Sequence, residues 1–486
     1  MFRVLFVSVT PPLATGRCTT FSHRLLTTGL PLLAGTFVVV AASAAIARTV
    51  NPTTPRPSAR HGAAPVSSVS SSSAKTSAVH DSNADRTALR ARLRAERKVA
   101  LTDEKKAEMR AAMDAAAAEA ATSNLTALRA IGPFLAQTST GRDEFLTKIA
   151  DRIAESEKTP GVIFDVKGPH VYFATTSPLA EKLNRIDISY DLPHVLSVLK
   201  ERGIYTMARF IALKDPGLAG VAPETQIHNP KTGVSVGDVW VDGSNATTLG
   251  YNMEVLKDLV NSGIDEVNFD YIRFPTEYSL AQVGLTKEEK IEKVESFLKA
   301  ARQVVDESGS KTKLGISTYA IIGWDYDINV QYLGQDVVRF APLVDIISPM
   351  AYPDSFSREG YYDPTKNKGS RMYYLVYHTM MGYREELGSE AWKLRPWIQG
   401  YFVDRQDVQD QINAVFDSGS CGFTVWNANN NYDPTFAALD SWDAPQDCVP
   451  QGFPYDTTVV TKSNGGAVHA AAPEVPSSAA RLKNQR

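Results

Sequence analysis

Short apolar segments alternate with amphipathic stretches between residues 128 and 448, and this alternation limits the possible folds more than any other feature of the chain. The apolar segments have the length of strands, whereas stretches such as "YNMEVLKDLVNSG" repeat their apolar residues every three or four positions, as a helix does. Strands that alternate with helices in this number are typical of a (β/α)8 TIM barrel of the α/β class, which we predict as the fold. The predicted strands are 130–136, 161–166, 204–212, 264–269, 313–319, 344–350, 395–401 and 422–426.

A doubly wound open sheet is the alternative fold for the same alternation. Such sheets usually place a glycine-rich phosphate-binding turn after their first strand. No such turn follows residues 130–136. The barrel is therefore the preferred prediction.

Residues 1–50 have the features of a signal peptide or a membrane anchor. An apolar run from residue 25 to residue 47 contains no charged side chain and follows Arg3, Arg17 and Arg24. This run is longer than the roughly 20 residues that cross a bilayer, and it ends in "AIA", which suits signal peptidase. We therefore expect an extracytoplasmic protein, either secreted after cleavage or held at a membrane by residues 25–47.

Changes in composition divide the rest of the chain into a linker, a helix, a domain and a tail. Residues 51–85 are rich in Ser, Pro and Ala, which predicts a disordered linker. Residues 86–122 are rich in Ala, Arg, Glu and Lys, which predicts a charged spacer helix, with a weak coiled coil as the alternative. The barrel domain is predicted over residues 128–448, and residues 457–486 are predicted to be a disordered tail.

The overall composition excludes several classes of protein. Hydrophobic residues make up 43% of the chain, which is enough for a large core, and a net charge of -3 without a basic stripe argues against a nucleic-acid partner. Three cysteines are too few for a disulfide scaffold, although Cys421 and Cys448 could pair after export. Paired-histidine zinc spacing, the GxSxG elbow and the P-loop are all missing, so we predict no metal and no cofactor. The segment "NANNNYD" leaves calcium open as an alternative.

Polar side chains stand at the ends of the predicted strands, where TIM barrels carry their catalytic groups. The segment "VNFDYIRFP" places Asn268 and Asp270 on one face of a strand, and "GVIFDVKG" is expected to do the same for Asp165 and Lys167. Each acid also has a structural alternative, as a helix cap or as half of an ion pair. The candidate site residues are Asp165, Lys167, Arg209, Lys214, Asn268, Asp270, Arg273, Asp325, Tyr352, Gln399, Trp426 and Asn427.

This mixture of acids, amides and aromatic rings suits a carbohydrate, because aromatic faces stack on sugar C–H groups while polar groups bind the hydroxyls. Glycoside hydrolysis needs two carboxyl groups, one protonated and one ionised. We expect Asp270 to be the nucleophile or general base. The expected general acid is Asp325 or Asp165, with Asp325 preferred. The other candidates are expected to bind the sugar, with Trp426 as the stacking platform.

Eight segments in order give the chain a family resemblance, among them "GVIFDVKG", "GIDEVNFDYIRFP", "VDIISPMAYP" and "RPWIQGY". Over residues 128–434 the chain resembles the family described as "putative glycosyl hydrolase domain", long catalogued as a domain of unknown function. The resemblance implies a TIM barrel, a glycosidase activity and Asp270 as the favoured catalytic carboxylate. It also places Asp165, Lys167, Arg209 and Lys214 on polar positions of the family.

The chain departs from the family pattern near the fifth strand. The family tends to carry an acid there, whereas "GISTYA" offers Ser317 and Thr318. If that acid is the proton donor, Asp325 or another residue must replace it. Chitinase-like barrels end their fourth strand in DxxDxDxE, and their Glu aligns with Ile272 here, so the chitinase mechanism does not apply.

The preferred prediction is therefore an exported glycoside hydrolase that acts on a polysaccharide of a cell surface or matrix. A non-catalytic barrel that binds surface glycan is the alternative, and a scaffold without a sugar pocket is a third. Two carboxyl groups about 5 to 10 Å apart would favour catalysis, whereas an isolated Asp270 would favour binding.

Overall fold

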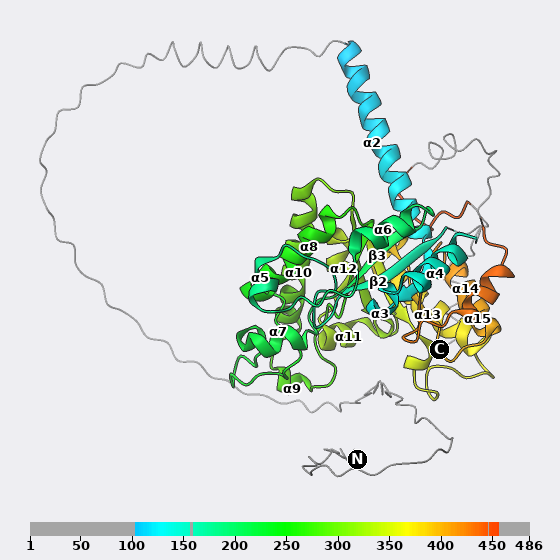
Figure 1. The fold of residues 1–486 in the computed structure, drawn as a ribbon. Helices are drawn as coiled ribbons and strands as arrows, with labels where there is room; N and C mark the ends of the chain where they lie inside the picture. Colours follow the sequence, from blue (N-terminus) through cyan, green and yellow to red (C-terminus); the bar gives the residue numbers. More distant parts are fainter. Residues whose placement is uncertain (1–102, 156–158, 446, 456–486) are drawn as a thin grey trace, which may run out of the picture. The chain divides into compact units, whose positions relative to one another are not determined.

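The computed structural model describes residues 103–155, 159–445 and 447–455. Eight parallel strands, paired in chain order, close into a barrel in which β1 also pairs with β8, and this confirms the predicted TIM barrel. Helices surround the strands (Figure 1). The predicted strands are all present with small shifts at their ends. The strands are β1 Ile131–Leu135, β2 Gly161–Lys167, β3 Tyr205–Ile211, β4 Glu266–Asp270, β5 Lys313–Tyr319, β6 Ile346–Ala351, β7 Trp397–Gln399 and β8 Phe423–Trp426.

Helices follow the strands, and their ends are fixed by local sequence. Helix α10, for example, begins with a capping box between Thr286 and Glu289 and ends at Gly309 in the left-handed conformation. The longer helices are α2 Asp103–Arg129, α4 Asp143–Ala154, α6 Leu192–Lys200, α8 Ala246–Asn261, α10 Lys287–Ser308, α11 Tyr326–Leu333, α13 Arg371–Leu387, α14 Arg405–Asp417 and α15 Asp433–Asp440. The shorter helices are α3 Gln137–Thr140, α5 Pro178–Lys182, α7 Pro216–Val221, α9 Leu280–Val283 and α12 Val337–Phe340, and the 3-10 turns are η1 Pro223–Thr225, η2 Ala320–Gly323, η3 Ala341–Leu343, η4 Pro353–Ser355 and η5 Gly388–Lys393.

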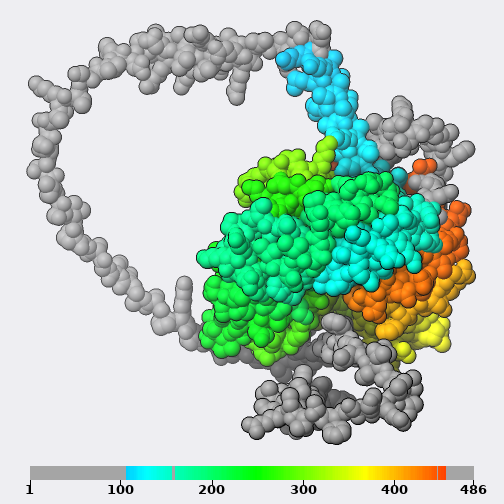
Figure 2. All heavy atoms as spheres, in the orientation of Figure 1, coloured from blue at the N-terminus to red at the C-terminus, as the bar shows by residue number. Residues whose placement is uncertain are grey.

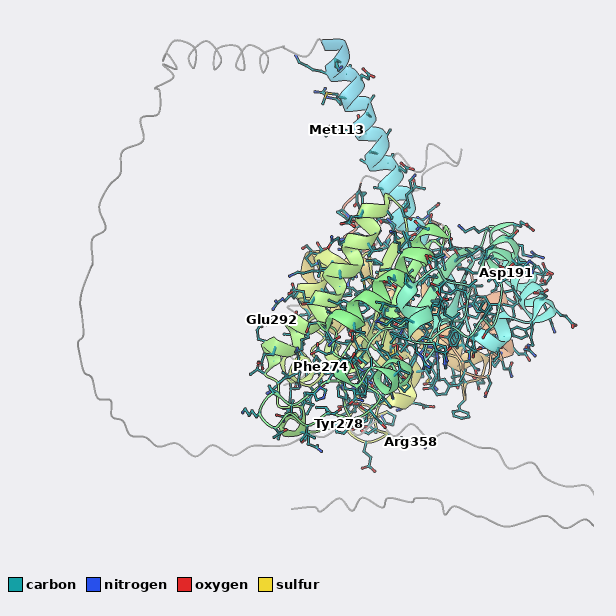
Figure 3. All side chains as sticks on the ribbon, turned by 60° about the vertical axis from the view of Figure 1, so that its left-hand side comes forward. Met113, Asp191, Phe274, Tyr278, Glu292 and Arg358 are labelled. Carbon is teal, nitrogen blue, oxygen red and sulfur yellow. A yellow bond between two sulfur atoms is a disulfide. The ribbon has the colours of Figure 1, made fainter. Side chains whose placement is uncertain are left out.

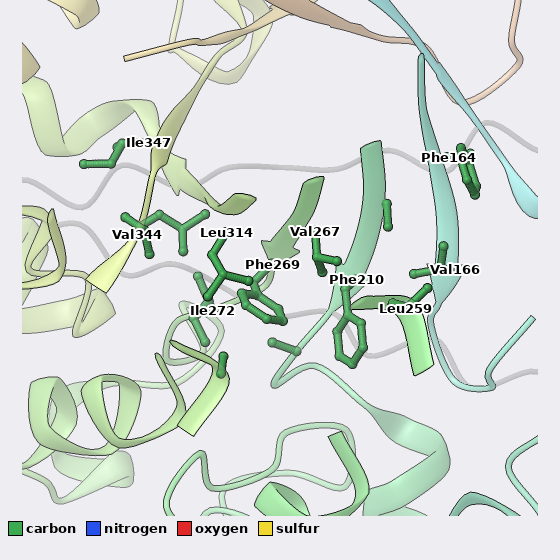
Figure 4. Packing of buried hydrophobic residues seen from close by; sticks show 14 of the residues in the cluster. Phe164, Val166, Phe210, Leu259, Val267, Phe269, Ile272, Leu314, Val344 and Ile347 are labelled. Atoms are coloured by element: carbon green, nitrogen blue, oxygen red, sulfur yellow. The ribbon is translucent and has the colours of Figure 1, made fainter. Parts of the chain in front are cut away.

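The main core lies between the outer faces of the strands and the surrounding helices (Figure 4). Phe269 of β4 packs edge-on against Phe210 of β3 at 5.4 Å and against Phe297 of α10 at 5.3 Å. Each of these rings is fully buried, and burial of such a ring stabilises the fold by about 1.5–3 kcal/mol. Alternation along the strands then directs the residues between them toward the inside of the barrel.

The end of α2 covers the N-terminal end of the barrel. Arg395 donates hydrogen bonds to both carboxylate oxygens of Glu266, at 2.7 and 2.8 Å, and a further one to the carbonyl of Ala127 in α2. Lys313 at the start of β5 bonds to Asn124 of α2 at 2.7 Å. A buried ion pair and a helix therefore close this end of the barrel.

The first turns of α2 are exposed, and they stand out in blue in the space-filling view (Figure 2). Met113, labelled in Figure 3, is 70% exposed. The helix runs seven residues past the predicted spacer, to Arg129. The predicted signal or anchor segment 1–50, the linker 51–85, the first part of the spacer and the tail 457–486 lie outside the described residues.

Cys421 and Cys448 form a disulfide with a Cα–Cα distance of 5.6 Å. It joins the chain just before β8 to the segment that follows α15. Within the ranges that the structure describes, no helix has both the length and the apolar character needed to cross a membrane.

Candidate active site

One arginine joins two carboxylates at the C-terminal end of the barrel. Arg209 of β3 donates from Nη1 to Oδ1 of Asp165 at 2.7 Å and from Nε to Oδ2 of Asp270 at 2.8 Å. Its Nη2 also lies 2.7 Å from the same Asp270 oxygen. The register explains this meeting, because Asp165 on β2 pairs with Arg209, and Asp270 ends β4 on the other side of β3. Three residues singled out in the sequence therefore meet at the carboxyl ends of neighbouring strands.

The two carboxylates have different surroundings. Burial raises the pKa of Asp165; Arg209 opposes this effect, and the nearby charge of Asp270 adds to it. Asp270 receives a hydrogen bond from the backbone N–H of Tyr271 to Oδ1 at 2.7 Å, in addition to its contacts with Arg209. One guanidinium group bonds to both acids, so the two carboxylates are neighbours at this end of the barrel.

Four aromatic rings form a wall beside these acids, and we call them the aromatic wall: Phe134, Tyr352, Tyr401 and Trp426. Trp426 stacks with Phe134 at 6.5 Å and lies 5.9 Å from Tyr352 and 5.4 Å from Tyr401. The wall adjoins the acids, because the guanidinium carbon of Arg209 lies 5.3 Å from the Phe134 ring centre. Burial raises the pKa of Tyr352, and the charge of Asp270 raises it further. Tyr352 and Trp426 therefore belong to the same region as Asp270.

Backbone strain is concentrated at this end of the barrel. Among the residues that the structure describes, four other than glycine have positive φ, and three of them follow strands: Tyr271 after β4 (53°), Phe402 after β7 (52°) and Asn430 after β8 (53°). Bulky residues rarely adopt this conformation, and such residues collect at functional sites. The strain thus lies at the strand ends that also carry the acids and the aromatic wall.

Lys167 does not share a face with Asp165, so that expectation is wrong. A β-bulge lies between them, and Asp165 pairs with Arg209 while Lys167 pairs with the next residue, Phe210. Lys167 therefore points into the helix layer, where its ammonium bonds to Asp215 at 2.7 Å and to the carbonyl of Ile211 at 2.9 Å. Both partners of the ion pair are fully buried. Lys167 stabilises the base of the β3 loop instead of facing the mouth.

Arg273 and Lys214 lie against Tyr271. Arg273 is almost fully buried, donates to the hydroxyl of Tyr319 at 2.6 Å and sits over the rings of Tyr271 and Trp240 at 5.5 and 4.8 Å. The Lys214 ammonium lies 5.2 Å from the Tyr271 ring centre. Both cations pack against the ring of Tyr271, the residue that follows Asp270. They therefore help to hold the backbone next to this acid in place.

The side-chain amides of the three predicted sugar-binding residues form hydrogen bonds within the protein. Asn268 lies inside the barrel and accepts a hydrogen bond from Ser317 at 2.8 Å. Gln399 exchanges two hydrogen bonds of 2.9 Å with Asp354. Asn427 donates to the carbonyls of Gly400 and Asn431. Gln399 and Asn427 fix strand ends and loops around the mouth, whereas Asn268 bonds within the barrel.

The fifth strand carries a neutral network where the family tends to have an acid. The Ser317 hydroxyl accepts from Nε1 of Trp397 at 2.9 Å, and the Thr318 hydroxyl accepts from Tyr383 at 2.7 Å. Asp325, the preferred general acid, is an exposed residue that precedes α11, and in the described part of the chain its carboxylate has no ion pair with Arg209 or any other cation. Asp165, the other candidate, is therefore the acid that the structure brings next to Asp270.

Some residues of this region carry no signal in the sequence. Phe134 lies in "IGPFL", which reads as an ordinary apolar strand, and nothing in the letters distinguishes its ring from a core ring. Tyr271 and Phe402 occupy positions where glycine would be expected. Among the described residues, no group of three or more His, Cys, Asp or Glu could hold a metal ion.

Residues 132–432 match the family described as "Putative glycosyl hydrolase domain". The chain belongs to this family. The match includes every strand of the barrel except the first residue of β1. The family assignment agrees with the resemblance noted in the sequence and makes carbohydrate the expected class of substrate for this glycosyl hydrolase domain.

Several solved structures are similar to this family member. A hypothetical protein from Ruminiclostridium thermocellum is 27% identical, with 37% of this chain and 95% of that chain covered and a TM-score of 0.32. The α-galactosidase TtGalA from Thermus thermophilus is 12% identical, with 65% and 62% covered and a TM-score of 0.40. The spore cortex-lytic enzyme SleL from Bacillus cereus is 11% identical, with 65% and 76% covered and a TM-score of 0.41. No curated protein matches the chain.

Proposed function

We propose that the protein is a glycoside hydrolase that cleaves a polysaccharide with the carboxyl pair Asp165 and Asp270. The observation that carries the proposal is the single guanidinium of Arg209, which bonds to both acids at the mouth of the barrel. Glycosidases need two carboxyl groups on either side of the bond that breaks. The aromatic wall beside the pair supplies the apolar surface on which a sugar ring stacks.

The two acids have separate roles in this proposal. Asp165, whose pKa burial raises, holds a proton and gives it to the glycosidic oxygen as that bond breaks. Asp270, whose carboxylate accepts hydrogen bonds from Arg209 and from the N–H of Tyr271, either attacks the sugar carbon or takes a proton from the attacking water. Asp325 drops out of the pair because it is exposed and has no contact with Arg209.

Two features support an exported enzyme that acts outside the cytoplasm. The predicted signal or anchor segment comes before the barrel domain in the chain. The disulfide between Cys421 and Cys448 is of the kind that persists in oxidising compartments. We therefore propose a surface or matrix polysaccharide as the substrate.

The test is Asp270→Asn, which preserves size and removes the charge. The purified chain is incubated with a panel of soluble polysaccharides, and released reducing ends are counted. The variant should lose turnover by about 10²-fold or more, while it remains folded at the temperature of the assay. Full activity of this variant would overturn the assignment of Asp270.

A non-catalytic sugar-binding barrel is the second candidate. The neutral network around Ser317, at a position where the family tends to carry an acid, favours it. In that case a polysaccharide of the same panel would bind but release no reducing ends, and Asp270→Asn would change only its affinity.

A further inference from the structure

Phe402 is the most exposed large hydrophobic residue in the described part of the chain. It is 90% exposed, compared with 70% for Met113, the next highest. It lies in the connection between β7 and α14, three residues after Gln399. Burial therefore contributes almost nothing that would explain an aromatic side chain at this position.

The backbone conformation of Phe402 also argues against a role of this residue in stabilising the fold. Its φ of 52° lies in the left-handed region, which glycine adopts readily and bulky residues avoid. Such strain costs about 1–3 kcal/mol and persists where function requires it. Phe402 combines a strained backbone with an exposed ring. Binding of a ligand therefore explains this residue better than a contribution to folding does.

The position of the ring indicates what it binds. Phe402 stands edge-on to Tyr401 at 5.6 Å, and Tyr401 in turn stands edge-on to Trp426 of the aromatic wall at 5.4 Å. Phe402 therefore continues the aromatic wall from Phe134 and Trp426 out to the solvent. The wall begins at the ring that Arg209 contacts and ends at an open aromatic face.

We propose that Phe402 is an outer stacking platform, which binds a sugar unit of the same polysaccharide beyond the unit held at the two acids. This inference rests on the proposed function and deepens it, because it makes the substrate a chain of at least two sugars. An open ring face suits the C–H face of a pyranose. A membrane surface is disfavoured as the occupant, because residues 403–407 carry two acids, Asp404 and Asp407, against one cation, Arg405, and this net negative charge would repel anionic lipid.

The experiment measures binding separately from cleavage. In an Asp270→Asn background, Phe402→Gly, Phe402→Ala and Phe402→Trp are compared by affinity electrophoresis in gels that contain each soluble polysaccharide of the panel. We expect Phe402→Gly and Phe402→Ala to raise the Kd by about 3- to 10-fold, and Phe402→Trp to retain the parent's affinity. Ile188→Ala, at another exposed hydrophobic residue (60%), is the matched control and should leave the Kd unchanged.

A thermal melt of the same variants separates binding from folding. Phe402→Gly should melt no lower than its parent, because glycine relieves the strain while the ring buries almost no surface. Weaker binding with an undiminished melting temperature would support the proposal.

The outcomes that overturn it are distinct from failure of the proposed hydrolysis. Unchanged affinity in Phe402→Gly would overturn the inference even if the parent enzyme releases reducing ends. Weaker binding in Phe402→Gly without any hydrolysis by the native chain would support the platform and overturn the proposed catalysis. The inference is overturned if no polysaccharide in the gel retards the migration of the parent protein. It is also overturned if the parent sediments with phosphatidylglycerol vesicles and Phe402→Gly sediments less.

Discussion

Asp165 and Asp270 lie on opposite edges of one guanidinium group, that of Arg209. Each acid comes from a strand that neighbours β3, so the geometry of the barrel fixes their separation. The side chains of all three residues are only 9–12% exposed, which strengthens the electrostatic interactions among them. The pair is thus held by the most rigid part of the fold.

The general acid can be identified by comparing two conservative variants. Asp165→Asn should lower kcat on a polysaccharide by about 10²-fold, because the proton donor is lost. The kcat of Asp325→Asn should stay close to that of the parent, since Asp325 is exposed and is not one of the two paired acids. Initial rates of reducing-end release measure both. The reverse ranking would restore Asp325 as the acid.

Turnover should fall as the pH rises through the raised pKa of Asp165. Burial keeps this carboxyl protonated to a higher pH than the 3.8 that is usual for an aspartate, and the proposed donor works only while protonated. The alkaline limb of kcat/KM against pH should therefore lie above that usual value. The limb belongs to the coupled pair, so Asp270 influences its position.

The same shift affects stability with a defined sign. Asp165 binds its proton more tightly in the folded than in the unfolded chain, so its contribution to stability is complete at low pH and is lost as the pH rises through the raised pKa. Asp165→Asn should remove this component from the pH dependence of the free energy of unfolding, measured in urea. A parent and variant with parallel pH dependence would contradict the raised pKa.

Lys167 should matter for folding and not for direct contact with sugar. Lys167→Met leaves Asp215 charged and buried, which should lower the free energy of unfolding by about 3–5 kcal/mol. Lys167→Met combined with Asp215→Asn should recover much of this loss, because the charge is removed while the side chain still caps α7 at Leu218. Urea unfolding measures both. Normal stability together with weaker sugar binding would restore Lys167 to the binding site.

The disulfide should stabilise the chain measurably. It closes a loop of 27 residues, for which loop entropy predicts about 3.5 kcal/mol. Cys448→Ser should lower the urea midpoint accordingly, and dithiothreitol should lower that of the parent but not of the variant. Equal midpoints for Cys448→Ser and the parent would show that the bridge does not stabilise the fold.

The sequence predicts the barrel because each strand is a short apolar run and each helix repeats its apolar residues every three or four positions. The rule that strand ends meet then brings Asp165, Arg209 and Asp270 together without coordinates. The bulge after Asp165 escapes this reasoning, since nothing in "FDVKG" indicates an extra residue in the ladder, and the assumed alternation put Lys167 on the wrong face. Side-chain contacts such as that of Phe134 with Arg209 depend on tertiary packing that one strand's letters do not contain.

The left-handed residues at the mouth have a consequence for anyone who modifies this protein. Glycine at Tyr271 or Phe402 would relax the chain locally, so selection for heat tolerance alone would favour such replacements. The resulting variants should melt later, but replacement of Phe402 would remove the ring that we propose as the outer stacking platform. A screen of this protein that rewards only thermal stability would therefore select against the Phe402 ring.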